Sequence, residues 1–148
     1  MVRAYSVQGA AAVGTNLTIL GVTATTAVRP SIYELNVGCG ATPADQAGVF
    51  RLARYTAAGT STSVTPKPID PANPACVSTS GYNHTVEPTY TSGEVMLAFP
   101  LNQRATFRWV AVPGSEFIAP ATAANGLGFY SLSNTGTASH TAHFLFTE

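Results

Sequence analysis

The chain has 148 residues, of which 45% are hydrophobic and only 9% are charged, and its formal net charge is zero. This length fits a single domain that can bury a sizeable core. The neutral balance argues against binding to nucleic acid, which requires a clustered basic surface, and the seven Lys and Arg residues are spread along the chain. No stretch reaches the ~20 consecutive apolar residues of a membrane-spanning helix, and polar residues interrupt the segment after Arg3, so we expect neither a membrane span nor a signal peptide.

Low charge also bears on association. Ordinary soluble domains carry about 25% charged residues. A surface with so little charge repels other copies only weakly, which favours an assembled state. A Thr-rich β domain that does not assemble would have the same composition, so both interpretations stand.

Residues 1–14 are rich in alanine and glycine and offer few side chains for packing. We expect them to form an N-terminal arm, with the β domain covering residues 15–148. The arm would order against a neighbouring subunit, and its candidate contacts are Val2, Arg3, Tyr5 and Val7. The alternative is a frayed chain terminus.

Strand patterns follow along the chain. Residues 16–24 and 48–56 are plausible strands, and residues 31–38 alternate so that Tyr33, Leu35 and Val37 share one face. The segment 66–74 contains four prolines in nine residues, which forbids a central strand because proline lacks the ladder N–H. We expect a rigid surface loop there, continued by the Ser-, Gly- and Asn-rich residues 76–85.

The densest apolar segments lie between Glu94 and Ser133. Phe107 and the single tryptophan, Trp109, fall on one face of a strand, opposite Thr106 and Arg108. Polar or turn-forming residues at Asn102-Gln103 and Pro113-Gly114 separate the apolar segments from one another. Period-two patterns cut by Pro, Gly and Asn predict an all-β fold: a single-domain antiparallel β-sandwich or barrel, jelly-roll-like, with about eight strands.

We find no catalytic, metal-binding or cofactor motif. His140 and His143 are three residues apart and would point to opposite faces of a strand, which disfavours a metal site. Glu34 and Glu94 lie on predicted strands, so a carboxylate dyad stays open beside the simpler interpretation of solvated carboxylates. The two cysteines show no zinc or redox spacing and are expected to be free thiols, although Cys39 between two glycines also fits an exposed nucleophile.

Arg104 and Arg108 flank Phe107 and would share the face opposite it. Arginine and aromatic residues are typical anchors of protein interfaces. The two arginines are therefore candidate subunit-interface residues. The alternative is an ordinary cross-strand ion pair, for example with Glu94.

Three phrases carry a resemblance to a known family: ATPAD at 41–45, the proline loop at 66–74, and LNQRATFRWVA at 101–111. They resemble small structural proteins of tailed bacteriophages, and the likeness covers roughly Arg29 to Glu148. None of the three phrases is a catalytic motif.

The resemblance implies a non-enzymatic virion component without a cofactor, namely a capsid decoration (cement) protein. Such proteins trimerise on the outer capsid surface and bind the major capsid protein, after assembly in the host cytoplasm. The N-terminal segment would then grip the capsid. The alternative is a tail, fibre or head-knob module that binds carbohydrate through exposed tyrosines: Tyr33, Tyr82, Tyr90 and Tyr130.

Overall fold

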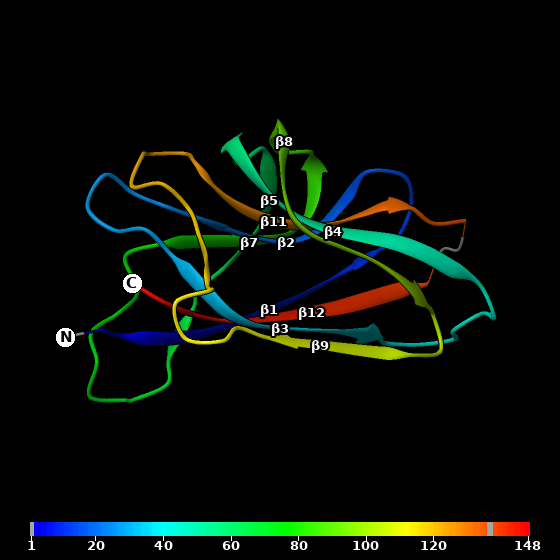
Figure 1. Ribbon diagram of the computed structural model, residues 1–148, viewed down its shortest axis with the longest axis horizontal. Coiled ribbons are helices and arrows are strands. Elements are labelled where there is room, and N and C mark those ends of the chain that lie inside the picture. The colour runs from blue at the N-terminus through cyan, green and yellow to red at the C-terminus, as the bar shows by residue number, and fades with distance from the viewer. Residues whose placement is uncertain (1, 136–137) are drawn as a thin grey trace.

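The computed structural model describes residues 2–135 and 138–148. Within them the chain forms twelve β-strands and no helix, and the strands make two antiparallel sheets that pack face to face (Figure 1). The predicted all-β sandwich is confirmed. The strand count exceeds the expected eight because two two-residue strands, one strongly polar strand and the segment expected to form an arm also pair.

Sheet A, the lower layer in Figure 1, has a central ladder of five strands, and a sixth strand also pairs with β3. In spatial order the ladder contains β10 (Phe117–Ile118), β3 (Ser31–Cys39), β12 (Ser139–Thr147), β1 (Ala4–Ala12) and β6 (Lys67–Pro68), and the additional strand is β9 (Thr106–Val110). The proline-rich segment thus contributes only β6, at the sheet edge, where a missing N–H is tolerated.

Sheet B, the upper layer, has six strands in one path. Its order is β5 (Thr60–Val64), β7 (Thr79–Val86), β2 (Leu17–Thr23), β11 (Gly126–Ser133), β4 (Ala47–Ala57) and β8 (Thr89–Asn102). Strand β7 lies where the sequence predicted a loop. It is accommodated because β2 and β5 pair with it on both sides.

The core lies between the two sheets. Phe50 stacks on Phe129 at a centroid distance of 5.6 Å, and the alternating residues Ala142, Phe144 and Phe146 of β12 are fully buried. In β3 the expected alternation fails at one point. A register irregularity lies opposite Leu145 and Phe146, so Ile32 turns into the core with Leu35 and Val37 while Tyr33 is only half-buried.

The N-terminal segment is not an arm outside the domain. Residues Ala4–Ala12 are strand β1, which pairs with β12 over its whole length and with β6 on its other side. Tyr5 is 0% exposed and Val7 is 2% exposed, so neither side chain reaches a partner. The small residues have a packing role, since a Cβ atom on Gly9 would collide with Tyr82 of the opposite sheet.

Sheet B is buried locally on its outer face as well. The segments β5 and β8 rise above it (Figure 1), and Tyr55 and Tyr90 cover glycines of β11. The Tyr55 and Tyr90 hydroxyls hydrogen-bond to Thr23 Oγ1 (2.7 Å) and Thr18 Oγ1 (2.8 Å) respectively. Aromatic rings that cover glycines replace the packing that the glycines lack.

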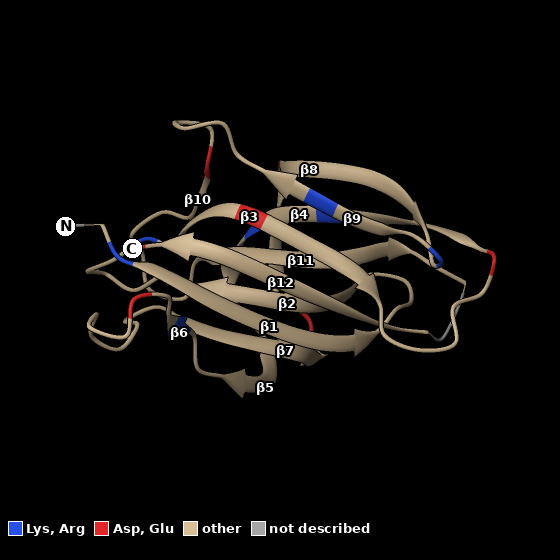
Figure 2. Ribbon diagram, turned by 90° about the horizontal axis from the view of Figure 1, so that it is seen from below, with Lys and Arg blue, Asp and Glu red and all other residues tan. Residues whose placement is uncertain are grey.

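The outer face of sheet A, in contrast, is open. Figure 2 shows that it carries few charged residues; Glu34 on β3 and Arg108 on β9 form an ion pair there. The other outward-facing positions combine polar residues such as Ser6, Gln8 and Thr141 with His143 and Leu145 of β12. Figures 1 and 2 also place the two ends of the chain at the same end of the sandwich.

Candidate subunit interface

One side of the sandwich exposes a strip of aromatic and aliphatic side chains. There the edge strand β8 of sheet B lies beside β9 and β10 of sheet A, and aromatic rings fill the gap between them. Phe99 stacks on Phe107 with ring centroids 3.8 Å apart, and Trp109 stacks on Phe117 at 4.2 Å. We call the strip the aromatic seam and define it by five half-buried residues: Met96, Leu97, Phe107, Trp109 and Phe117.

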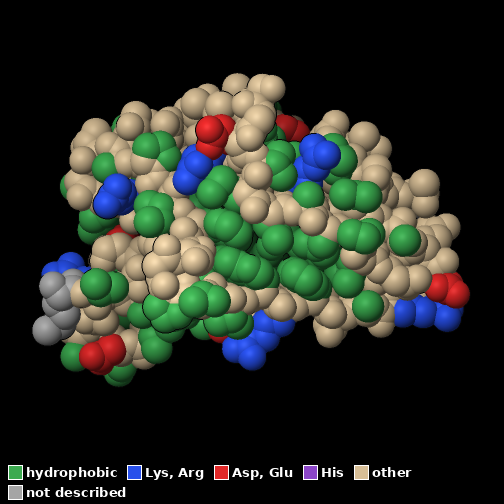
Figure 3. Space-filling view, viewed as in Figure 1, with side chains coloured by type: hydrophobic (Ala, Val, Ile, Leu, Met, Phe, Trp, Pro, Cys, Tyr) green, Lys and Arg blue, Asp and Glu red, His purple; other side chains and the backbone are tan. Residues whose placement is uncertain are grey.

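Figure 3 views this side of the molecule and shows hydrophobic side chains gathered in a band across its middle. The band follows from strand alternation. Phe107 and Trp109 turn toward the core while Thr106 and Arg108 face solvent, as the sequence predicted. The seam stays partly open because no further strand covers it within the described residues.

An ion pair borders the seam on the side of sheet A. Arg108 donates two hydrogen bonds to the Glu34 carboxylate, at 2.9 and 3.0 Å, and the Asn36 amide donates a third at 2.8 Å. The hydrogen bond from Arg108, supported by that from Asn36, lowers the pKa of Glu34. Arg108 therefore has its partner within the same chain, on an adjacent strand.

Arg104 lies apart from this pair. It is exposed in the turn between β8 and β9, where its backbone amide donates to Asn102 Oδ1 at 3.0 Å. The predicted common strand face of Arg104 and Arg108 is thus wrong, because the turn ends before β9 begins at Thr106. Arg104 has no side-chain hydrogen bond or ion pair with the described residues, which leaves its charge available to a neighbour.

A second ion pair borders the seam on the side of sheet B. Arg54 of β4 binds Glu94 of β8 at 2.6 Å and donates from Nε to the Ile118 carbonyl at 2.9 Å. Glu34 and Glu94 are therefore each paired with a different arginine rather than with each other. The role of Arg54 could not be predicted from the sequence, because its partner Glu94 is 40 residues away along the chain.

The tyrosines proposed for carbohydrate recognition are not free surface residues. Tyr130 is only 7% exposed, and its ring lies 4.4 Å from that of Tyr90 in the cluster over sheet B. Burial is the main cause that raises the pKa of Tyr90 well above its ordinary value. Tyr33 and Tyr82 are half-buried.

The residues with possible chemical roles are dispersed. His140 is buried against Phe50, whereas His143 lies on the outer face and shares a hydrogen bond of 2.8 Å with Ser6, so the two imidazoles point to opposite faces as predicted. Among the described residues no group of three or more His, Cys, Asp or Glu converges on one point. Cys39 and Cys76 are free thiols, as expected, although both are half-buried.

Of the proposed arm contacts, only Val2 is largely exposed, at 76%. The Arg3 backbone amide pairs with the carbonyl of Glu148, which fixes the beginning of β1 against the end of β12. Tyr5 and Val7 belong to the core. These four residues therefore form no common binding surface.

No protein-family model, no curated protein and no solved structure matches this chain. In the part of the chain that the structure describes, no helix is long and apolar enough to cross a membrane.

Proposed function

We propose that this protein is a structural component of a bacteriophage virion: a decoration protein that sits on the outer capsid surface as a homotrimer and binds the major capsid protein. The observation that carries the proposal is the aromatic seam. It presents Trp109, Phe107, Phe117 and Met96, bordered by Arg104 and Arg108. Aromatic residues, methionine and arginine are the types enriched at protein interfaces and their hot spots.

The seam is assigned to contact between copies of the chain. A neighbouring copy that covers Trp109 and Phe117 would complete the burial of rings that are already stacked and fixed by the fold, so little side-chain freedom is lost on association. The exposed Arg104 lies at the border of this surface, where a carboxylate from the neighbour would pair with it.

The remaining support comes from the charge and the family resemblance. With 9% charged residues and zero net charge, the copies repel one another weakly. The phrases at 41–45, 66–74 and 101–111 resemble small phage structural proteins, and they lie in the loop before β4, around β6, and along the turn and strand that carry the seam.

The experiment compares Trp109→Ser with Val86→Ser. Val86 is the control for an apolar residue outside the seam, because it is 58% exposed and lies on β7, toward the opposite edge of sheet B. We expect the unsubstituted protein and the Val86 variant to sediment as trimers, and the Trp109 variant to sediment as a monomer with an unchanged circular dichroism spectrum. A monomer for the unsubstituted protein at all concentrations would refute the trimer.

The capsid assignment has its own test. Purified phage capsids that lack decoration protein are mixed with the protein and pelleted. We expect saturable binding at symmetry-related sites in a particle image. Absence from the pellet, or density on the tail alone, would refute decoration of the capsid while leaving the trimer unaffected.

A further inference from the structure

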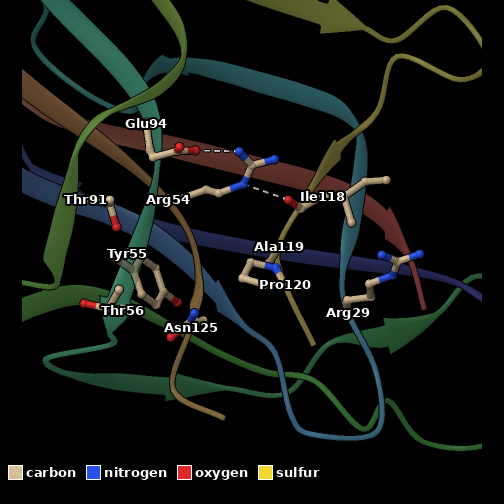
Figure 4. A pocket seen from close by; sticks show the side chains of 10 residues that line it. All are labelled: Arg29, Arg54, Tyr55, Thr56, Thr91, Glu94, Ile118, Ala119, Pro120 and Asn125. Atoms are coloured by element: carbon tan, nitrogen blue, oxygen red, sulfur yellow. Dashed lines mark hydrogen bonds and ion pairs between the residues drawn. The ribbon is translucent and has the colours of Figure 1, made fainter. Parts of the chain in front are cut away.

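A cavity of about 460 Å³ opens beside the Arg54–Glu94 ion pair, next to the aromatic seam (Figure 4). Its volume falls in the range of ligand-binding pockets, about 300–1,000 Å³. One wall is apolar and the others carry a few polar groups. The apolar wall consists of Ile118, Ala119 and Pro120, and the polar groups include Thr56, Thr91 and Asn125.

Arg54 is held in place at this cavity. Figure 4 shows its guanidinium between Glu94 and Ile118, and the two hydrogen bonds to these residues use two of its five N–H donors. The other three donors have no acceptor among the described residues. Glu94 and the Ile118 carbonyl therefore fix the guanidinium while leaving part of its hydrogen-bonding capacity for another molecule.

Arg29 supplies a second guanidinium. It lines the same cavity, it is exposed, and its side chain makes no hydrogen bond or ion pair with any described residue. With Arg54, Arg29 and Glu94 counted together, the cavity has one net positive charge. One excess charge matches a single carboxylate better than a doubly charged phosphate.

We propose that this cavity binds a carboxylate that is carried on a short apolar group. The planar guanidinium group of an arginine such as Arg29 can donate two parallel hydrogen bonds to one carboxylate. The group behind the carboxylate would lie on the wall formed by Ile118 and Pro120, and the Asn125 amide is a further polar contact. The ligand is either a small free acid or the carboxylate of a polypeptide. This inference does not rest on the function proposed above, because it is argued from the cavity beside the seam and concerns a different partner.

The test uses ¹⁵N-labelled protein at low salt and four probes. Isobutyrate represents the free acid, and N-acetyl-Ala-Ala-Val with a free carboxylate represents the polypeptide. Isobutyramide and the C-terminal amide of the tripeptide are the neutral controls. We expect saturable shifts of the Ile118, Ala119 and Asn125 amide signals with the acids and none with the amides.

Two variants assign the binding to the cavity. Arg29→Gln should weaken binding of the acids about tenfold or more, since a charge-assisted pair is lost. Arg104→Gln removes an equally exposed arginine outside the cavity and should leave the affinity unchanged. Both positions are exposed, so both variants should fold.

The tripeptide acid binding more tightly than isobutyrate would identify a polypeptide as the source, and equal affinities would identify a free acid. The proposal is overturned by the absence of saturation with either acid, by equal binding of the neutral amides, or by an unchanged affinity in the Arg29 variant. Sedimentation of the Arg29 variant shows separately whether the protein still forms the same oligomer, so a loss of acid binding is distinguished from a change in assembly.

Discussion

The Glu148 carboxylate accepts a hydrogen bond of 2.9 Å from the backbone amide of Ser78, 70 residues earlier in the chain. It also accepts from the Val77 amide at 2.7 Å and from the Cys76 thiol at 3.3 Å. One side chain thus ties the end of β12 in sheet A to the segment that leads into β7 of sheet B. Burial opposes ionisation of this carboxyl, but the hydrogen bonds together outweigh it and lower its pKa.

We predict that Glu148→Gln destabilises the protein by about 1–2 kcal/mol at pH 7, because charge-assisted hydrogen bonds are weakened. A carboxyl with a lowered pKa stabilises the fold above its ordinary value of 4.5, and this contribution disappears as the pH falls through the folded-state value. The stabilities of the variant and the unsubstituted protein should therefore converge as the pH falls below 4.5. Urea unfolding across this range measures the difference, and Asp70→Asn in an exposed loop is the control. Parallel curves would show that the carboxylate has no such role.

The thiol beside this carboxylate should react slowly. Burial, with the nearby charge of Glu148, raises the pKa of Cys76 to about 12. Because the thiolate is the reactive form, iodoacetamide at pH 8 should modify Cys39 first and Cys76 slowly. Mass spectrometry of the alkylated protein over time measures both rates. Glu148→Gln should accelerate the reaction of Cys76 alone, and an unchanged rate in that variant would disprove the link.

Gly126 should not tolerate a side chain. A Cβ atom there would collide with the Val22 carbonyl oxygen and with the ring of Tyr55, which is 2% exposed and bonded to Thr23. We expect Gly126→Ala to lower the free energy of unfolding by about 1–3 kcal/mol. In Gly40→Ala the new Cβ would make only ordinary contacts, at 3.6 Å or more, so its effect should be small. Chemical denaturation compares the two variants. Equal losses of unfolding free energy would mean that Tyr55 does not pack tightly against β11.

His140 should make stability depend on pH near neutrality. It is 0% exposed, and burial lowers its pKa, only partly offset by a contact of 3.4 Å from its Nδ1 to the Ala138 carbonyl. A histidine of this kind is neutral in the folded state. Its contribution to stability is complete above the ordinary value of 6.5 and is lost as the pH falls from there toward the folded-state value.

His140→Leu should therefore reduce the fall in stability between pH 7 and pH 5, measured by urea unfolding. Part of the fall should remain, because burial also lowers the pKa of His84. A double variant that also carries His84→Gln should have a nearly flat profile over this range. An unchanged slope in the single variant would show that the His140 ring is accessible to protons in the folded protein.

The fold class could be predicted because the strongest strands alternate between buried and exposed residues. Strand β12 and the run from Thr106 to Val110 show this plainly. Strand β7 escaped prediction because its sequence, TSGYNHTV, has no apolar alternation, and pairing with β2 and β5 holds it in place instead. Strand β1 was predicted to be part of an N-terminal arm, because its alanine and glycine residues fit a flexible tether as well as they fit the close approach of two sheets.

The candidate interface was only half predictable. Phe107, Trp109 and Arg108 are neighbours in the sequence, so their strand faces follow from alternation. Phe117, which stacks on Trp109, lies beyond the break at Pro113-Gly114, and only the pairing of β10 with β3 brings it close. The cavity beside Arg54 could not be found from sequence, since its walls come from four separate parts of the chain.

The pairing of β1 with β12 has a consequence for biosynthesis. These two strands occupy the middle of sheet A and are separated by more than a hundred residues, so β1 has no central partner until β12 has left the ribosome. Tyr5 lacks its stacking partner Phe146 during that time, and contacts of such long range form slowly. The nascent protein is thus most exposed to chaperones and to aggregation just before β12 emerges.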